Sequence, residues 1–185
     1  LHSLEGHSGW INAVAVTELC ARHGIAVAGV TKCVCGEPDV ARAMLAGGCT
    51  MLADSRLANV ARMRDAGIEA PILLLRLPAL SEAADVVRLC DLSLVSEVDT
   101  VRALSAAAQT QDASHGVILM VEGGDRREGV MPEDTAAACR DILALPNIEL
   151  AGVGTSLNCL CGVLPTPENQ QTFAGIVDRV ETELG

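Results

Sequence analysis

Short aliphatic runs alternate with amphipathic segments along the whole chain. The runs are rich in Val, Ile, Leu and Ala and carry few polar residues, as strands that are buried on both faces do. They predict β-strands over 25–31, 50–53, 71–76, 90–95, 117–122 and 149–154. Strands that alternate with helices in this way form βα units, which build a parallel sheet.

Helix start and stop signals lie between these runs. Pro38 stands in the first turn of one helix and Gly67 follows another, where it is expected to act as a left-handed C-cap. The expected helices cover about 9–22, 37–46, 56–66, 82–89, 97–108 and 167–184, and the expected N-caps are Ser81, Ser96 and Thr166, the last followed by Pro167.

The pattern contains about six βα units of one kind and no composition break. A closed (β/α)8 barrel has eight units and about 250 residues, whereas this chain has 185 residues. The predicted fold class is α/β, a TIM-type barrel truncated to about six βα units, with residues 1–185 as one domain and the remaining barrel units beyond Gly185. An open doubly wound sheet is the structural alternative.

Charge and hydropathy narrow the class of partner. The formal net charge is -11, which argues against nucleic acid and anionic membrane surfaces, because both select clustered Lys and Arg. No stretch reaches the roughly 20 apolar residues of a membrane span, and the N-terminus lacks a signal-peptide pattern. We therefore expect a soluble cytoplasmic protein with a small-molecule partner.

The cysteines and histidines do not predict a metal site. Cys33-x-Cys35 and Cys159-x-Cys161 lack the two-to-four-residue gap usual in zinc sites, although a shared metal site is the alternative. The eight cysteines are expected to be reduced and mostly buried. The histidines are absent from the predicted strand ends, which favours surface or structural roles for His2, His7, His23 and His115.

Polar residues follow the predicted strands, at the edge where α/β proteins assemble their sites. Lys32 is the only lysine in the chain and follows the strand 25–31. Unlike arginine, a lysine amine can lose its proton and attack a carbonyl, so Schiff-base chemistry is one interpretation. A surface lysine in an arginine-rich composition is the other.

The segment Gly123–Gly129 follows another strand and is rich in glycine. It could hold a phosphate through its backbone N–H groups, but it matches neither of the common nucleotide-binding motifs. Arg127 is a candidate donor to a phenolate or carboxylate oxygen, and an ion pair with a neighbouring acidic residue is the alternative.

Five motifs together resemble the alanine/ornithine racemase family of enzymes that use pyridoxal 5'-phosphate (PLP). They are Val30-Thr31-Lys32-Cys33-Val34-Cys35-Gly36, Leu52-Ala53-Asp54-Ser55-Arg56-Leu57-Ala58-Asn59, Leu74-Leu75-Arg76-Leu77-Pro78, Gly124-Asp125-Arg126-Arg127-Glu128-Gly129 and Asn158-Cys159-Leu160-Cys161-Gly162-Val163-Leu164-Pro165-Thr166. The resemblance runs from about Asn12 to the last residue. It implies a PLP-binding barrel followed by a β-rich domain, a homodimer, and racemisation of a free amino acid of the alanine or ornithine type.

The resemblance also implies roles for single residues. Lys32 would be the Schiff-base lysine and one of the proton-transferring groups, and Arg127 would approach the ring oxygen of PLP. Ser156 stands where the family more often has Asn, and Arg126 replaces the more usual Leu, which leaves substrate preference and ring electronics open. The expected cofactor-binding set is Lys32, Ser55, Arg76, Ser96, Arg127 and Ser156, with the phosphate segment and the opposite-face base expected beyond Gly185.

Other functions are compatible with the same barrel. A PLP-carrier protein without turnover and a PLP-dependent D-amino-acid aldolase or decarboxylase are two of them. A metal-binding protein that uses the two Cys-x-Cys pairs is a third.

Overall fold

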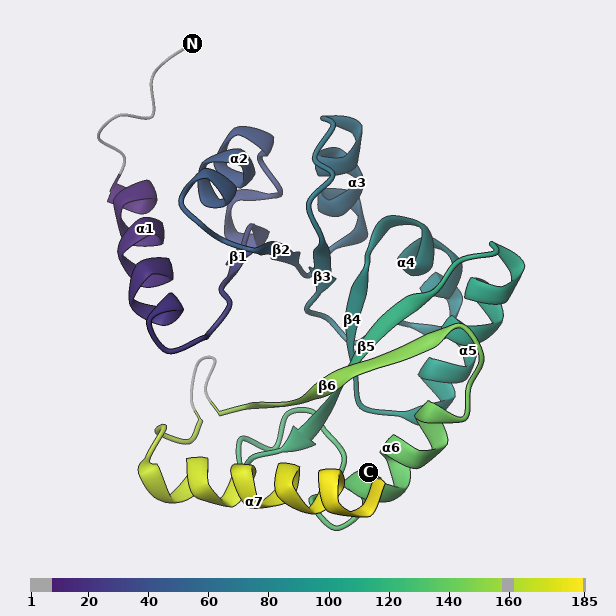
Figure 1. Ribbon diagram of the computed structural model, residues 1–185. Helices are drawn as coiled ribbons and strands as arrows, with labels where there is room; N and C mark the ends of the chain where they lie inside the picture. Colours follow the sequence, from purple (N-terminus) through teal and green to yellow (C-terminus); the bar gives the residue numbers. More distant parts are fainter. Residues whose placement is uncertain (1–7, 158–161, 185) are drawn as a thin grey trace. The chain divides into compact units, whose positions relative to one another are not determined.

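The computed structural model describes residues 8–157 and 162–184 of the chain. Strands and helices alternate through these residues, with two short 3-10 turns, η1 (Lys32–Val34) and η2 (Leu80–Glu82) (Figure 1). The strands are β1 (Ala28–Val30), β2 (Met51–Asp54), β3 (Ile72–Leu74), β4 (Leu92–Val95), β5 (His115–Glu122) and β6 (Ile148–Ser156). The helices are α1 (Ser8–Ala21), α2 (Pro38–Ala46), α3 (Leu57–Asp65), α4 (Ala83–Leu89), α5 (Val98–Thr110), α6 (Thr135–Leu143) and α7 (Pro167–Leu184).

The strands form one sheet in the order β1-β2-β3-β4-β5-β6, which is their order along the chain. The pairs β1–β2, β2–β3 and β5–β6 are parallel. Sequential parallel strands joined by helices are the βα units that the hydrophobic pattern predicts, so the α/β prediction is confirmed.

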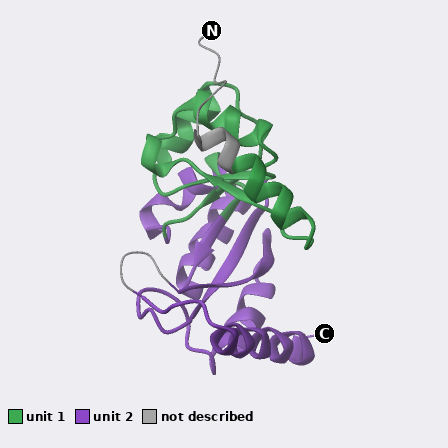
Figure 2. Cartoon of the chain, turned by 90° about the vertical axis from the view of Figure 1, so that its left-hand side faces the viewer, with its two compact units in different colours: residues 1–76, 89–92 green, residues 77–88, 93–185 purple. Residues whose placement is uncertain are grey.

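The chain divides into two compact units, which Figure 2 distinguishes by colour. Unit 1 consists of residues 1–76 and 89–92 and contains β1 to β3 with α1 to α3. Helices α2 and α3 pack on its strands. Its core is aliphatic, and the largest fully buried side chains are Leu52, Val60, Met63 and Ile72.

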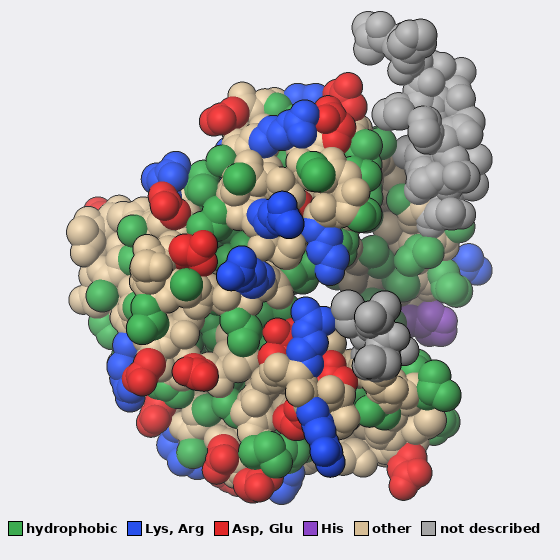
Figure 3. Space-filling model, turned by 180° about the vertical axis from the view of Figure 1, so that it is seen from behind, with side chains coloured by type: hydrophobic (Ala, Val, Ile, Leu, Met, Phe, Trp, Pro, Cys, Tyr) green, Lys and Arg blue, Asp and Glu red, His purple; other side chains and the backbone are tan. Residues whose placement is uncertain are grey.

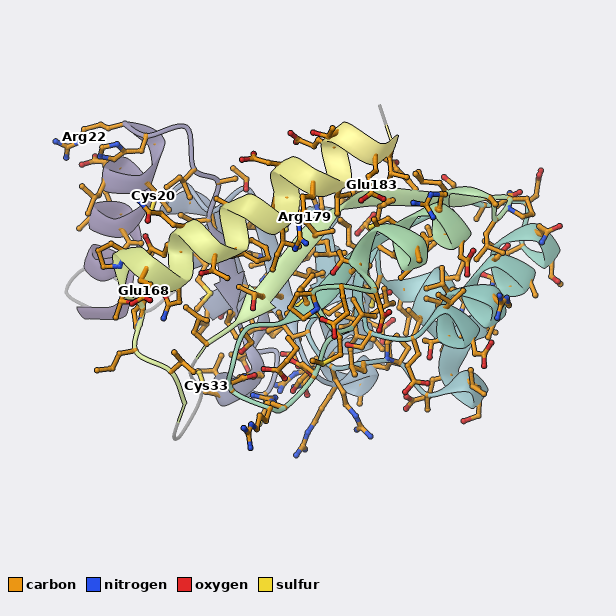
Figure 4. The ribbon with its side chains drawn as sticks, turned by 90° about the horizontal axis from the view of Figure 1, so that it is seen from below. Cys20, Arg22, Cys33, Glu168, Arg179 and Glu183 are labelled. Atoms are coloured by element: carbon orange, nitrogen blue, oxygen red, sulfur yellow. The ribbon has the colours of Figure 1, made fainter. Side chains whose placement is uncertain are left out.

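Unit 2 consists of residues 77–88 and 93–185 and contains β5 and β6 with α5 to α7, and most of α4 and β4. Its largest fully buried side chains include Leu104, Leu119 and Ile142. Helix α7, which carries Arg179 and Glu183 in Figure 4, packs on α6. An ion pair of 2.9 Å between Arg140 and Glu183 joins these two helices.

Three of the predicted helix ends are confirmed. Pro38 is the first residue of α2, and Gly67 takes a φ of +77° just after the C-cap of α3. At the start of α7, the Thr166 backbone N–H donates to Asn169 Oδ1 at 2.9 Å, and the Asn169 N–H donates to Thr166 Oγ1 at 3.3 Å. These reciprocal bonds satisfy two N–H groups that the helix itself cannot.

The two predicted serine N-caps are wrong. Ser81 lies inside η2, whose N-cap is Ala79, and α4 begins only at Ala83. The N-cap of α5 is Glu97, and the Ser96 hydroxyl makes no capping bond. A serine before a helix supplies a cap only if its backbone leaves the preceding segment at the required angle, which a sequence pattern does not report.

Three predicted strands are shorter in the structure, and one of them, 90–95, is a strand only over Leu92–Val95. The run 25–31 becomes a strand only over Ala28–Val30, because the Ile25 N–H donates to Cys20 O at 3.0 Å and closes the end of α1. The run 71–76 ends at Leu74, which leaves Arg76 in the following loop rather than in the strand. The hydrophobic pattern also assigned no bounds to α6.

The described cysteines are free, and half of them are buried. Cys49, Cys90 and Cys139 lie in the core, while Cys33 and Cys35 are exposed. Burial raises the pKa of the Cys90 thiol from 9.0 to about 12, so this thiol is protonated and unreactive at neutral pH.

His115, the first residue of β5, is buried with its Nε2 2.6 Å from Ser93 Oγ, which agrees with a structural role. None of the helices in the described ranges combines the length and the apolar character that a membrane span requires.

Candidate functional site

The sequence-predicted site residues follow the carboxyl ends of the strands. In unit 1, Lys32 comes after β1, Ser55 after β2 and Arg76 after β3. Because these three strands are parallel neighbours, their carboxyl ends form one edge of the sheet. Unit 1 therefore brings Lys32, Ser55 and Arg76 to a common edge.

Lys32 begins a tight turn that is closed by the carbonyl of Thr31. Thr31 O accepts the Val34 N–H at 3.0 Å and the Gly36 N–H at 3.2 Å. The turn ends with two left-handed residues, Cys35 at φ +55° and Gly36 at φ +64°. Lys32 is exposed on this turn, and so is the neighbouring Cys33, which Figure 4 labels.

The carboxylate of Asp54, the last residue of β2, is fully buried and organises this edge. Its Oδ2 accepts the Thr31 hydroxyl at 2.8 Å. Its Oδ1 accepts the backbone N–H groups of Ser55 at 2.7 Å and Arg56 at 3.0 Å, and the Asn59 side-chain amide at 3.0 Å. Four donors thus compensate the desolvation of one buried carboxylate.

Gly36 packs directly against the first turn of α3. A Cβ atom at Gly36 would lie 2.7 Å from Asn59 O and 2.8 Å from Asn59 Cβ. Only glycine fits this approach with a positive φ. The close approach fixes the end of the Lys32 turn against α3.

In unit 2, the loop after β5 folds around another carboxylate. Glu122 Oε1 accepts the backbone N–H of Gly124 and, at 3.1 Å, that of Arg126. The loop then returns to β5, where the Glu122 N–H donates to Val130 O at 2.9 Å and the Val130 N–H donates to Met120 O at 2.8 Å. Arg127 is exposed on this closed loop.

The same loop borders a cavity of about 480 Å³. Arg126 and Arg127 line it, together with Glu128 and Met131. Neither arginine forms an ion pair with a carboxylate among the residues that the structure describes. The predicted alternative for Arg127, an ion pair with a neighbouring acidic residue, is therefore wrong for the described part of the chain.

Ser96 and Ser156 are the other predicted site residues of unit 2. Ser156 is the last residue of β6 and is half-buried. Ser96 directly follows β4, and its hydroxyl oxygen is buried without a hydrogen-bond partner among the described residues. An unpaired buried hydroxyl costs about 1–3 kcal/mol, so this atom is suited to bond a ligand.

Most helix arginines form ion pairs and the cations after the strands do not, while Arg179 on α7 also has no ion pair among the described residues. The ion pairs of the described residues all use helix arginines, namely Arg42, Arg62, Arg64, Arg88, Arg102 and Arg140. Lys32, Arg76, Arg126 and Arg127 have no such partner in the same part of the chain. Figure 3 shows exposed Lys and Arg side chains on one face, among apolar and acidic ones. Unpaired cations beside strand ends favour an anionic ligand.

No cluster of three or more His, Cys, Asp and Glu side chains in the described ranges could hold a metal ion. Cys159 and Cys161, as well as His2 and His7, lie outside the described residues, so the structure does not test the second Cys-x-Cys pair.

The sequence places Asp54 and Glu122 among the polar residues at the predicted strand ends, but it assigns neither of them a role in holding the next turn. Both are carboxylates that end a buried strand and accept backbone N–H groups of the next turn. The available signal was their position, an acidic residue directly after an aliphatic run and before a polar turn.

The chain is similar to known proteins over nearly its whole length. A family model described as alanine racemase, N-terminal domain, matches residues 12–184. An ornithine racemase of Acetoanaerobium sticklandii is 37% identical over 94% of this chain and 49% of its own length, and a lysine racemase of Thermotoga maritima is 35% identical over 94% and 48%. An alanine racemase structure from Clostridium difficile superposes with a TM-score of 0.78 at 21% identity, over 98% of this chain and 50% of that one. The chain therefore spans about half the length of the relatives it matches.

Proposed function

Because the chain belongs to the alanine racemase N-terminal domain family, we propose that it provides the Lys32-bearing part of an amino-acid racemase that uses PLP. The observation that carries the proposal is Lys32 itself. It is the only lysine of the chain, is exposed at the carboxyl end of β1, and has no ion pair among the described residues. An amine in this position is free to react with an aldehyde.

The residues at the strand ends fit the chemical groups of PLP. The Lys32 amine would hold the cofactor covalently through its aldehyde carbon. Arg127 would donate a hydrogen bond to an anionic oxygen of the ring or of the substrate. The Ser96 hydroxyl, which has no partner among the described residues, would form a hydrogen bond with the bound ligand. Ser55, Arg76 and Ser156 would complete the set. When bound, PLP supplies an electron sink that weakens the Cα–H bond of an amino acid.

Racemisation requires that a proton leave one face of Cα and return to the other. Lys32 Nζ would exchange the proton on one face of Cα, since it is the amine that would hold the cofactor. The named activities of the relatives, ornithine, lysine and alanine racemase, favour a free α-amino acid as substrate. We propose an alanine- or ornithine-type substrate.

The test uses the protein as its host makes it, incubated with PLP and then reduced with borohydride. We expect one reduced adduct, which peptide mapping places on Lys32. We also expect the optical activity of L-alanine or L-ornithine to decay, with uptake of one deuterium at Cα when the reaction runs in D2O. Absence of any adduct on Lys32 would contradict the proposal.

The same assays separate the competing functions. An adduct without turnover of any amino acid would favour the carrier protein. Release of an aldehyde from a β-hydroxy amino acid, or of carbon dioxide, would favour an aldolase or a decarboxylase. Either result would replace the racemase proposal while retaining Lys32 as the site of attachment.

Replacing Ser96 by alanine tests whether its unpaired hydroxyl serves a ligand. We expect Ser96→Ala to weaken PLP binding by about five- to tenfold, the value of one lost hydrogen bond. The Tm of the ligand-free protein should stay the same or rise, because the variant removes a buried hydroxyl that has no partner in the described structure.

Ser105→Ala is the matched control in the same unit. Ser105 Oγ is buried and donates to Pro146 O at 2.7 Å. Removing this hydroxyl should lower the free energy of unfolding by about 1 kcal/mol and leave PLP binding unchanged. If Ser96→Ala behaved like Ser105→Ala in both measurements, Ser96 would have a purely structural role.

A further inference from the structure

The Asp54 carboxylate uses its two oxygens for different elements. Oδ1 accepts the Ser55 and Arg56 N–H groups and the Asn59 amide, all at the start of α3. Oδ2 accepts the hydroxyl of Thr31, which is 23 residues earlier in the chain and directly precedes Lys32. Capping the start of α3 would need only Oδ1. Oδ2 instead binds the segment that carries Lys32.

The two oxygens hold the two ends of the Lys32 turn. Thr31 opens the turn, and its N–H also donates to Ala53 O at 2.9 Å. Gly36 closes the turn against Asn59, whose amide is bound to Asp54 Oδ1 at 3.0 Å. One buried carboxylate thus determines where the turn begins and, through Asn59, where it ends.

Helix α3 supports the same turn from a second point. Arg62 donates to Cys35 O at 3.4 Å and pairs with Glu37 at 2.7 Å. Both of these contacts are exposed, so solvent competes with them, whereas Asp54 and Thr31 are completely buried. Because a low local dielectric strengthens a hydrogen bond, the Asp54 bonds contribute the larger part of the restraint.

We propose that Asp54 is a positioning residue for Lys32: it fixes the backbone on both sides of the lysine so that the amine meets its partner carbonyl in one orientation. The inference rests on the proposed function in that Lys32 is taken as the reacting amine. Asp54 itself does not contact the reacting atoms. It acts through Thr31 and Asn59, and a rigidly held amine reacts at a smaller entropic cost than a mobile one.

The experiment changes the Thr31–Asp54 bond from each side. Asp54→Asn keeps one carbonyl oxygen for α3 and replaces the charged acceptor of the Thr31 hydroxyl by a neutral amide. The amide can form only a weaker bond to the Thr31 oxygen, while the Thr31 hydroxyl donates to Ala53 O, 3.3 Å away. Thr31→Val removes the hydroxyl with little change of shape, and Thr31→Ser restores it. Thr31→Val also keeps the test valid if Asp54→Asn does not fold.

We expect Asp54→Asn and Thr31→Val each to lower the equilibrium constant for the borohydride-reducible PLP adduct by roughly tenfold. The double variant should lose less than the sum of the two single losses, because both substitutions weaken the same Thr31–Asp54 interaction. Thr31→Ser should bind PLP like the unmodified protein. Ser105→Ala, whose Tm falls for an unrelated reason, should bind PLP normally, which separates positioning from a general loss of stability.

A second readout does not depend on PLP. Reductive methylation with isotope-labelled formaldehyde places NMR-visible methyl groups on the α-amino group and on Lys32, the single lysine of residues 1–185. The resonance that is missing in Lys32→Arg identifies the Lys32 methyl groups. We expect their resonance to shift and sharpen in Asp54→Asn and Thr31→Val but not in Thr31→Ser or Ser105→Ala.

The PLP adduct tests the proposed function, and the methyl resonance tests the positioning role independently of it. If the unmodified protein forms no adduct on Lys32, the proposed function is wrong, yet the methyl resonance still reports whether Asp54 holds the turn. If both Asp54→Asn and Thr31→Val keep normal PLP binding and an unchanged resonance, Asp54 is only the cap of α3 and the positioning role is refuted.

Discussion

Replacing Lys32 by arginine is expected to abolish the borohydride-reducible PLP adduct and to lower racemisation by roughly 10²–10⁴-fold, the range for removal of a positioned acid–base group. Arginine keeps the positive charge and much of the length of the side chain. It stays protonated in proteins, however, and therefore cannot attack an aldehyde. The substitution thus measures the effect of losing the nucleophilic amine while the positive charge is retained.

The variant leaves no lysine within residues 1–185. Peptide mapping locates any remaining reduced adduct, for example on the α-amino group. Cys33→Ser is the matched control, since Cys33 follows Lys32 on the same turn and is exposed. It should retain the adduct. A stoichiometric adduct in Lys32→Arg at another residue would contradict the assignment of Lys32.

The second large effect is expected at Gly129, where the loop that carries Arg127 returns to β5. Gly129 has a φ of +129°, and a Cβ atom there would lie 2.5 Å from both Glu122 N and Val121 C. These are backbone atoms of a strand, so they cannot move without breaking the bonds between β5 and Val130. Gly129→Ala should therefore cost roughly 2–5 kcal/mol, from backbone strain and overpacking together.

Thermal unfolding followed by circular dichroism measures this cost, since 1 kcal/mol changes Tm by about 2–4 °C in a chain of this size. Gly67→Ala is the control: Gly67 also has a positive φ, +77°, but a Cβ atom there meets no other atom within 4 Å. It should cost only about 1 kcal/mol. Equal losses of Tm in the two variants would show that the close approach at Gly129 does not matter.

If Gly129→Ala folds, it should also weaken PLP binding, because the closed loop that presents Arg127 depends on the contact between Gly129 and β5. Gly67→Ala should not. The pair of variants thus links the geometry of the loop to its proposed role.

Interactions between near neighbours in the chain could be predicted from the sequence. The alternation of aliphatic and amphipathic segments predicts the parallel α/β sheet, and Pro38, Gly67 and Thr166 mark helix ends correctly. Lys32 stands after its strand for the same reason. Each of these features depends on residues within a turn or two, whose preferences act locally.

The predictions at Arg76 and Ser96 were less accurate because the tertiary structure decides them. Arg76 lies in a loop because β3 ends at Leu74, and the Ser96 hydroxyl is buried without a described partner instead of capping a helix. Strand length follows from pairing with neighbouring strands, and a cap depends on the local backbone angle. Neither can be read from a short window of sequence.

By itself, the sequence determined that this protein builds βα units and places its single lysine after the first strand, because periodicity and composition act locally. Only the tertiary structure decided that Asp54 meets Thr31 from 23 residues away, that Gly36 lies against Asn59, and that Gly129 returns to β5. These contacts join residues that are distant along the chain, so no local sequence preference predicts them. They arise only when the packed sheet brings the ends of its strands together.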